Sequence, residues 1–228
     1  MKISINSVKI TTRKLSEVFC PHYCMGCGTL GAILCENCKN YNECDGMGVC
    51  LGCGAITKNG HCGRCKLPFE RGFTVGRKED GVLWRCVNEY KYKSVRALHV
   101  PLAGMLDATL PCLPMNTVAV PVPTNYRHVR GRGLDHTWLL GKELARMRGW
   151  ECKRIIKRVK NSVQVGTDAK TRAKQAKEAY GLNGEISDDV PYVVVDDVWT
   201  TGSTMKAVCE MLKKAGAKDV TAIVLVRA

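Results

Sequence analysis

The sequence lacks any apolar run close to the roughly 20 residues that a membrane-spanning helix requires. Residues 1–20 contain neither an apolar core segment nor a cleavage site made of small residues, so they do not resemble a secretory signal peptide. These absences argue against membrane insertion. We therefore expect a cytoplasmic protein.

Acidic residues are scarce, with 21 Asp and Glu against 35 Lys and Arg, which gives a formal net charge of +14. Residues 85–177 hold 19 of these cations and six acids, a net of +13. Such a field favours a polyanionic substrate, nucleic acid, or both, although a solvated lysine-rich surface is the alternative. The length of 228 residues suits one α/β domain of about 150 residues with a smaller attachment.

Cysteines are concentrated near the start of the chain, where ten of the fourteen lie between Cys20 and Cys65. Eight of them form two copies of a paired CxxC repeat, and Gly28 and Gly54 relax the backbone where amides turn toward sulfur. Disulfides would need an oxidising compartment, which nothing in the sequence supports. Redox chemistry usually relies on a single CxxC. The repeat therefore predicts two zinc ions.

Each predicted zinc ion has four thiolate ligands, which leave no open position for a substrate, so both sites are expected to be structural. We expect each copy of the repeat to hold one ion, although a cross-braced pairing fits the spacing too. A zinc module at residues 20–68, after an extension at 1–19, would need the metal to fold. The expected ligands are Cys24, Cys27, Cys35 and Cys38 for one ion, and Cys50, Cys53, Cys62 and Cys65 for the other.

Residues 193–204, VVVDDVWTTGST, predict a buried parallel strand followed by a turn, because three consecutive valines suit a strand covered on both faces. Residues 205–214 have helical periodicity and end before Gly216. A helix start with many hydroxyls and backbone N–H groups favours a phosphate dianion. The expected phosphate ligands are Thr200, Thr201, Gly202, Ser203 and Thr204.

Asp196 and Asp197 are expected at the carboxyl end of this strand, where open α/β sheets bind ligands. Adjacent carboxylates repel unless a cation or a hydroxyl-rich group lies between them. A sugar phosphate with Mg²⁺ meets both demands. The stretch resembles the phosphoribosyl pyrophosphate (PRPP) signature of the type I phosphoribosyltransferases; acids and threonines that merely cap the next helix are the alternative.

The middle of the chain adds a basic loop after a core strand predicted at residues 116–123. Arg130 and Arg132 are joined by a glycine in this loop and suit a pyrophosphate, because guanidinium pairs bidentately with phosphate; nucleic-acid phosphates would serve equally well. Lys91 could also reach ligand phosphates. Periodicity predicts helices at 82–90, 95–106 and 137–148, strands at 69–77 and 153–159, and a lid-like polar loop at 160–177.

From Cys24 onward the chain resembles the ComF family of phosphoribosyltransferase-like proteins. The resemblance rests on the CxxC knuckles, the Lys91-Tyr92 pair, the Val-Pro-Val-Pro strand, the Gln-Val-Gly segment at 164–166, and residues 193–204. Where the family often has Arg-Gly-Phe-Asn-Gln, residues 132–136 read Arg-Gly-Leu-Asp-His. No family role is therefore carried over to Asp135 or His136.

The resemblance implies a doubly wound parallel α/β sheet of about five strands in residues 69–228, with PRPP at its carboxyl edge. It also implies a link to natural transformation, with single-stranded DNA or competence-machinery proteins as partners. We expect a Mg²⁺-dependent phosphoribosyltransferase of unidentified acceptor, in which Asp196 and Asp197 hold the ribose hydroxyls directly or through Mg²⁺. The alternative is a non-catalytic PRPP sensor or single-stranded-DNA-binding protein.

Overall fold

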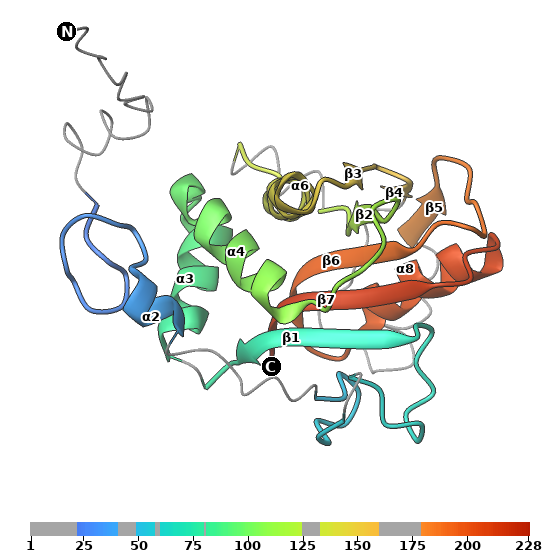
Figure 1. Ribbon diagram of the computed structural model, residues 1–228, viewed down its shortest axis with the longest axis horizontal. Helices are drawn as coiled ribbons and strands as arrows, with labels where there is room; N and C mark the ends of the chain where they lie inside the picture. Colours follow the sequence, from blue (N-terminus) through green and yellow to red (C-terminus); the bar gives the residue numbers. More distant parts are fainter. Residues whose placement is uncertain (1–21, 41–48, 58–59, 80, 125–132, 160–178) are drawn as a thin grey trace, which may run out of the picture.

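The structure is a computed structural model that describes residues 22–40, 49–57, 60–79, 81–124, 133–159 and 179–228. Its centre is a five-stranded sheet in the order β1-β7-β6-β2-β3, with every neighbouring pair parallel (Figure 1). A separate antiparallel hairpin joins β4 and β5. The strands are β1 (Arg71–Arg77), β2 (Val118–Pro121), β3 (Glu151–Cys152), β4 (Ile156–Arg158), β5 (Tyr180–Leu182), β6 (Tyr192–Trp199) and β7 (Val220–Arg227).

Helices cover both faces of the sheet, as the doubly wound prediction requires. Val193 and Val195 of β6 face an apolar layer with α3, α4 and α6, whereas Val194 faces a second layer with α8. Strand side chains alternate between faces, so an unbroken valine run fills both layers. The helices are α2 (Glu36–Asn40), α3 (Gly81–Tyr92), η1 (Arg96–Leu98), α4 (His99–Thr109), α6 (His136–Arg148) and α8 (Ser203–Lys214).

Most predicted elements form near their expected positions, and two predictions were inaccurate in detail. The strand expected at residues 153–159 divides, because Glu151 and Cys152 pair with β2 while Ile156–Arg158 leaves the sheet to pair with β5. Strand β6 continues to Trp199, so Asp196 and Asp197 lie inside the strand and not at its end. Among the described residues, no helix has the length and apolarity to cross a membrane.

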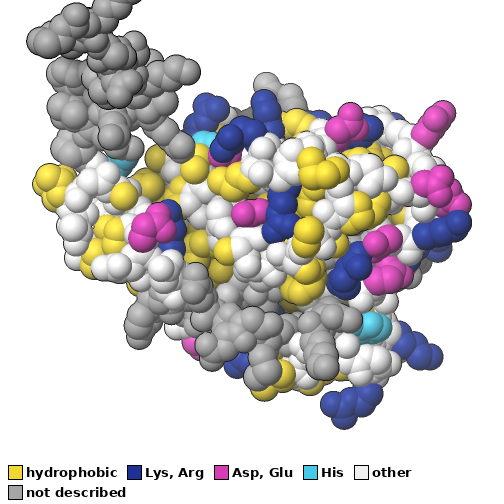
Figure 2. Space-filling view, in the orientation of Figure 1, with side chains coloured by type: hydrophobic (Ala, Val, Ile, Leu, Met, Phe, Trp, Pro, Cys, Tyr) yellow, Lys and Arg dark blue, Asp and Glu magenta, His cyan; other side chains and the backbone are white. Residues whose placement is uncertain are grey.

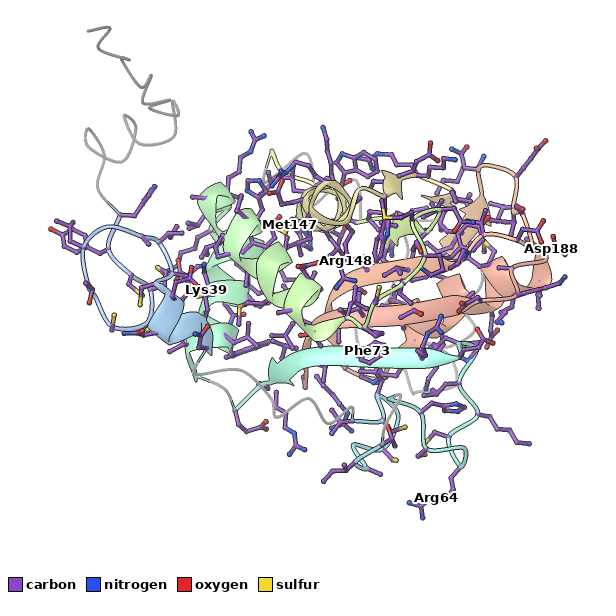
Figure 3. All side chains as sticks on the ribbon, viewed as in Figure 1. Lys39, Arg64, Phe73, Met147, Arg148 and Asp188 are labelled. Carbon is purple, nitrogen blue, oxygen red and sulfur yellow. The ribbon has the colours of Figure 1, made fainter. Side chains whose placement is uncertain are left out.

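The two cysteine knuckles pack on different layers of the domain. In the first knuckle, Cys24 and Leu34 join the layer of α3, and Arg85 donates a hydrogen bond to the carbonyl oxygen of Gly26. In the second, Leu51 joins the layer of α8. The labelled side chains of Lys39 and Arg64 mark the two knuckles in Figure 3. Each knuckle therefore contributes apolar side chains to the core of the domain.

Candidate functional site

Asp196 and Asp197 project to opposite faces of the sheet. They are consecutive residues of β6, and the side-chain period of a strand is two. Asp197 lies on the face of α3 and α6, where Lys91 and His136 contact it. Asp196 lies on the face of the β4–β5 hairpin, where its charge acts on Tyr180. The two acids therefore have separate environments and separate partners.

Asp197 is the centre of a buried polar cluster. Its Oδ2 lies 2.7 Å from Nζ of Lys91 and 2.9 Å from Nε2 of His136, and Asp197 is only 3% exposed. Burial alone would raise the pKa of Asp197, but the hydrogen bond from His136 and the charge of Lys91 hold that pKa below its usual range. Burial favours neutral Lys91, yet the charge of Asp197 raises the pKa of Lys91 overall. The cluster thus holds a carboxylate against an ammonium.

Contacts to both its backbone and its ring hold His136 in place. It begins α6, where Asp135 caps the helix by accepting the backbone N–H of Trp138. The hydroxyl of buried Tyr90 donates to the backbone oxygen of His136 at 2.7 Å. Its Nε2 faces the carboxylate of Asp197, which places the ring proton on that nitrogen. Among the described residues, Nδ1 of His136 has no hydrogen-bond partner.

Asp196 is partly buried, and its pKa is shifted in the opposite direction from that of Asp197. Its Oδ1 accepts the backbone N–H of Asp197 at 2.9 Å. Burial and the nearby charge of Asp197 raise the pKa of Asp196 to about 8, against the lowering effect of Lys91. A carboxyl of this kind gives up its proton when a cation arrives. Asp196 is therefore the better placed of the two acids to hold a metal ion or a sugar hydroxyl.

The predicted phosphate loop connects β6 to α8 and remains accessible at Thr200 and Thr201. Gly202 occupies the N-cap position of α8 with a φ of 71°, a conformation that favours glycine, and it provides no side chain to cap the helix. The hydroxyl of Ser203 lies 2.8 Å from that of Thr201. Lys206 points its Nζ at the backbone oxygen of Thr201 from 3.3 Å. Hydroxyls, helix N–H groups and a cation therefore meet at one helix start, which suits an anion.

Sequence reasoning missed two residues beside this loop. Tyr180 of β5 lies between Asp196 and Thr204, and Arg158 of β4 donates to its hydroxyl at 3.1 Å. Burial raises the pKa of Tyr180, with Arg158 opposing the rise. Arg158 therefore brings positive charge to the Asp196 side of the site. No motif marks either residue, because both reach the site only through the β4–β5 pairing.

The predicted pyrophosphate ligands divide between described and undescribed parts of the chain. Arg130 and Arg132 lie outside the described residues, and so does the whole lid-like stretch at 160–177. Lys91 is described, and its ammonium contacts Asp197. Its expected role toward pyrophosphate thus stays a prediction.

Each predicted zinc cluster is assembled by the fold in the sequential grouping. Within each set of four cysteines, all Sγ atoms lie within 4.8 Å of one another. Sγ of Cys27 lies 3.7 Å from Sγ of Cys35, and Cys53 lies 3.6 Å from Cys62. Zn–S bonds of about 2.3 Å in a tetrahedron place sulfurs about 3.8 Å apart. Both clusters therefore have the donor set and the spacing that zinc requires.

Backbone N–H groups prepare one thiol in each cluster, Cys24 and Cys62, for a metal. Burial would raise the pKa of Cys24, but N–H groups directed at its sulfur, including that of Cys35, lower it to about 6. The N–H of Cys65 is the main cause that lowers the pKa of Cys62 to about 6. Gly28 and Gly54 both have a φ of 76°, as expected for the turns of the knuckles. These contacts stabilise the thiolate form of Cys24 and Cys62, which is the form that zinc binds. Hydrogen bonds among the clustered thiols instead raise the pKa of Cys38 and Cys65 to about 12.

Comparisons with known proteins agree with this architecture. Residues 147–228 match the phosphoribosyl transferase domain family. The chain is 33% identical over 189 residues to the DNA utilization protein YhgH of Salmonella typhimurium, covering 76% of this chain and 82% of that protein. The chain belongs to the ComF/YhgH family. This ComF/YhgH protein is also 28% identical over 214 residues to competence protein F of Haemophilus influenzae, covering 86% and 90% of the two chains.

One solved structure was also matched. The purine phosphoribosyltransferase of Pyrococcus horikoshii is 19% identical, with a TM-score of 0.34, over 64% of this chain and 84% of that one.

Proposed function

We propose that this ComF/YhgH protein binds PRPP with Mg²⁺ and transfers its phosphoribosyl group to an acceptor, releasing pyrophosphate. The observation that carries the proposal is the junction of β6 and α8. There a partly buried acid with a raised pKa, Asp196, lies on the strand that leads into a hydroxyl-rich helix start. A sugar hydroxyl and a phosphate on one ligand match that pair of features.

The chain's own groups perform the binding steps. The backbone and hydroxyls of residues 200–204 hold the 5-phosphate, and Asp196 holds a ribose hydroxyl or the metal. Asp197, fixed by Lys91 and His136, sets the position of the strand that carries Asp196. Arg130, Arg132 and Lys91 offer positive charge to the leaving pyrophosphate. Bound Mg²⁺ would supply further neutralisation of that leaving group.

The bond changes are simple and require no protein nucleophile. The bond between the anomeric carbon and the pyrophosphate oxygen breaks, and its electron pair leaves with pyrophosphate. A lone pair of the acceptor forms the new bond to the anomeric carbon, and the acceptor then loses its proton. The transition state is cationic at the sugar, so positioning and charge stabilisation account for most of the catalysis.

Isothermal titration with PRPP and Mg²⁺ tests the binding half of the proposal. Asp196→Asn combined with Asp197→Asn should abolish PRPP binding, whereas Asp188→Asn should leave it intact. Asp188 is a matched control because it is exposed and paired only at the surface with Lys218, as its position in Figure 3 illustrates. Undiminished binding by the double variant would contradict the proposal. A screen of nucleobases and amines for PRPP-dependent pyrophosphate release tests the transfer half.

A second candidate function, binding of single-stranded nucleic acid, is favoured by a basic groove along α6. The groove has a volume of about 500 Å³, and its lining includes cations, two tryptophans and one acid, Glu143. Figure 2 shows Lys and Arg side chains gathered over the part of the molecule where α4 and α6 lie. Phosphates attract such cations, and bases stack on aromatic rings. The lining includes Arg96, His99, Trp138, Lys142, Arg146 and Trp150.

The two candidates are distinguished by their salt and ligand dependence. If the groove binds a single strand, Arg96→Ala with Lys142→Ala should weaken oligonucleotide binding and lessen its salt dependence, with PRPP binding unchanged. Lys214→Ala, at the far end of α8, is the control. Equal oligonucleotide affinity for all three proteins would rule out the groove as the site.

A further inference from the structure

Trp199, the last residue of β6, lies directly behind the phosphate loop. Its indole is 3% exposed. A Cβ placed on Gly202 would fall 2.1 Å from Cζ2 of this ring, so the ring leaves room for glycine alone. The backbone at Gly202 begins α8 and presents the first N–H groups of the helix. The position of the indole therefore determines the shape of the loop that would hold the 5-phosphate.

Phe69 packs against the indole. The two rings meet edge to face, with centroids 6.2 Å apart and an angle of 85° between their planes. Phe69 also shares the space over Gly72 of β1 with Leu51, since a Cβ on Gly72 would lie 2.7 Å from Phe69 and 3.1 Å from Leu51. Leu51 is fully buried and sits between the cluster ligands Cys50 and Cys53.

A second set of contacts, made by β7, links the second knuckle to Trp199. Arg227 of β7 pairs in register with Trp199 of β6. Its Nε donates to the backbone oxygen of Leu51 at 3.1 Å, and its guanidinium lies against Gly54. The backbone oxygen of Trp199 accepts the N–H of Ala228 at 2.8 Å. Strand β7 thus ties the second knuckle to the residue behind the phosphate loop.

We infer that the second cysteine cluster, when it holds its metal ion, positions the 5-phosphate loop through Leu51, Phe69 and Trp199. The inference rests on the proposed function, because the loop that it describes is the one proposed to hold the 5-phosphate. Trp199 is a positioning residue, since it shapes the loop from behind. A knuckle that loses its metal loses its fold, and Leu51 then loses its fixed place. An apolar packing chain of this kind transmits such a change to the loop.

The first cluster provides an internal control. Its contacts within the described residues include two with α3: Val82 lies near Gly26, and Arg85 donates a hydrogen bond to the backbone oxygen of Gly26. Trp84 lies on the same helix between those two residues. The chain therefore carries one tryptophan on the helix that contacts the first knuckle and another behind the phosphate loop.

The test compares two equivalent exposed ligands, Cys27 and Cys53, each replaced by serine in the full chain. The ligand is ribose 5-phosphate, which lacks pyrophosphate and so reports on the 5-phosphate loop alone. Tryptophans are labelled with fluorine and followed by ¹⁹F NMR, with Trp84→Phe and Trp199→Phe assigning two of the four resonances. Zinc content is measured alongside.

Cys53→Ser should lose one zinc ion, shift the Trp199 resonance and weaken ribose 5-phosphate binding about tenfold, the size of an ordinary coupling between two sites. Cys27→Ser should lose the other ion, shift Trp84 and retain affinity within about twofold. Wild-type affinity in Cys53→Ser, or equal weakening in both variants, would overturn the inference. If the unmodified protein binds neither ribose 5-phosphate nor PRPP, the proposed function fails instead.

A metal titration keeps the test decisive if Cys53→Ser does not fold. The Cys27→Ser chain retains the second cluster alone, and a chelator can remove that ion from it. Affinity for ribose 5-phosphate and the Trp199 resonance should change together as zinc leaves and should recover when zinc is restored. Loss of zinc with unchanged affinity would overturn the inference.

Discussion

Nζ of Lys91, near the end of α3, lies 2.7 Å from Oδ2 of Asp197, within β6. The contact joins the helical layer to the strand that leads into the predicted phosphate loop. Asp197 is nearly inaccessible, so its charge depends on this ammonium and on His136 for compensation. The ion pair therefore contributes to stability and to the geometry of the site together.

Lys91→Met should destabilise the fold by about 3 kcal/mol, because it leaves a buried carboxylate with one partner fewer. Urea unfolding measures the change. Lys93→Met on the same helix is the control, since Lys93 is 70% exposed in its pair with Glu89 and such pairs contribute about 0.5 kcal/mol. Adding Asp197→Asn to Lys91→Met should recover part of the loss. Similar effects of the two lysine variants would contradict a buried ion pair.

Affinity for Mg²⁺ with PRPP should rise with pH between about 6 and 8. The pKa of Asp196 is raised to about 8, so the proton must leave before this carboxylate can bind a cation, and fewer protons remain as pH increases. Titration calorimetry at several pH values in buffers of different ionisation enthalpy should also detect the released proton. Asp196→Asn should bind weakly with a flatter pH profile. If Asp196→Asn left the pH profile of binding unchanged, a group other than Asp196 would be responsible for the titration.

The pH dependence of stability should reveal the opposite shift of Asp197. Its folded-state pKa lies below the unfolded value, so its contribution is present above about pH 4, the unfolded value, and is lost as pH falls toward the folded pKa. The difference in unfolding free energy between the wild type and Asp197→Asn should therefore be constant from pH 5 to 6 and shrink in more acidic buffers. A difference that grows on acidification would contradict the sign of this shift.

Gly202→Ala should weaken PRPP binding and destabilise the protein. The φ of 71° costs a non-glycine residue about 1 kcal/mol, and the new methyl group would also displace the indole of Trp199. Gly104→Ala, in the interior of α4 with open space around it, should instead stabilise by about 0.8 kcal/mol. Thermal unfolding and calorimetry measure both effects. Retention of full affinity in Gly202→Ala would show that loop geometry is unimportant for binding.

Tyr180→Phe should weaken binding of ribose 5-phosphate several-fold, in line with loss of about 1 kcal/mol from one hydrogen bond. The hydroxyl connects Arg158 with the Thr204 end of the loop, and phenylalanine retains the packing of the ring. Tyr192→Phe is the matched control, because its hydroxyl accepts from Ser187 away from the loop. Equal effects of the two substitutions would assign Tyr180 a structural role only.

Local patterns in the sequence predicted the elements whose signals are local. The valines of β6 and the periodicity of α8 depend on neighbouring residues, and four thiols within a short loop favour one shared site. The opposite orientation of Asp196 and Asp197 also follows from strand periodicity, although the acids were expected to act side by side.

Contacts between distant parts of the chain were beyond reach of such patterns. His136 meets Asp197 because α6 packs over β6, and Tyr180 meets the loop because β5 pairs with β4. Tyr180 belongs to no recognisable motif, and the positions of both residues depend on tertiary packing. The departure at residues 132–136 marked His136 as unusual without indicating its partner.

The knuckles complete two apolar layers on opposite faces of one sheet. An expression fragment beginning at residue 69 would therefore expose Val82 on one face of the sheet and Phe69 on the other. Such a fragment should aggregate. Removing the cysteine-rich region to simplify crystallisation would therefore destabilise the remaining domain.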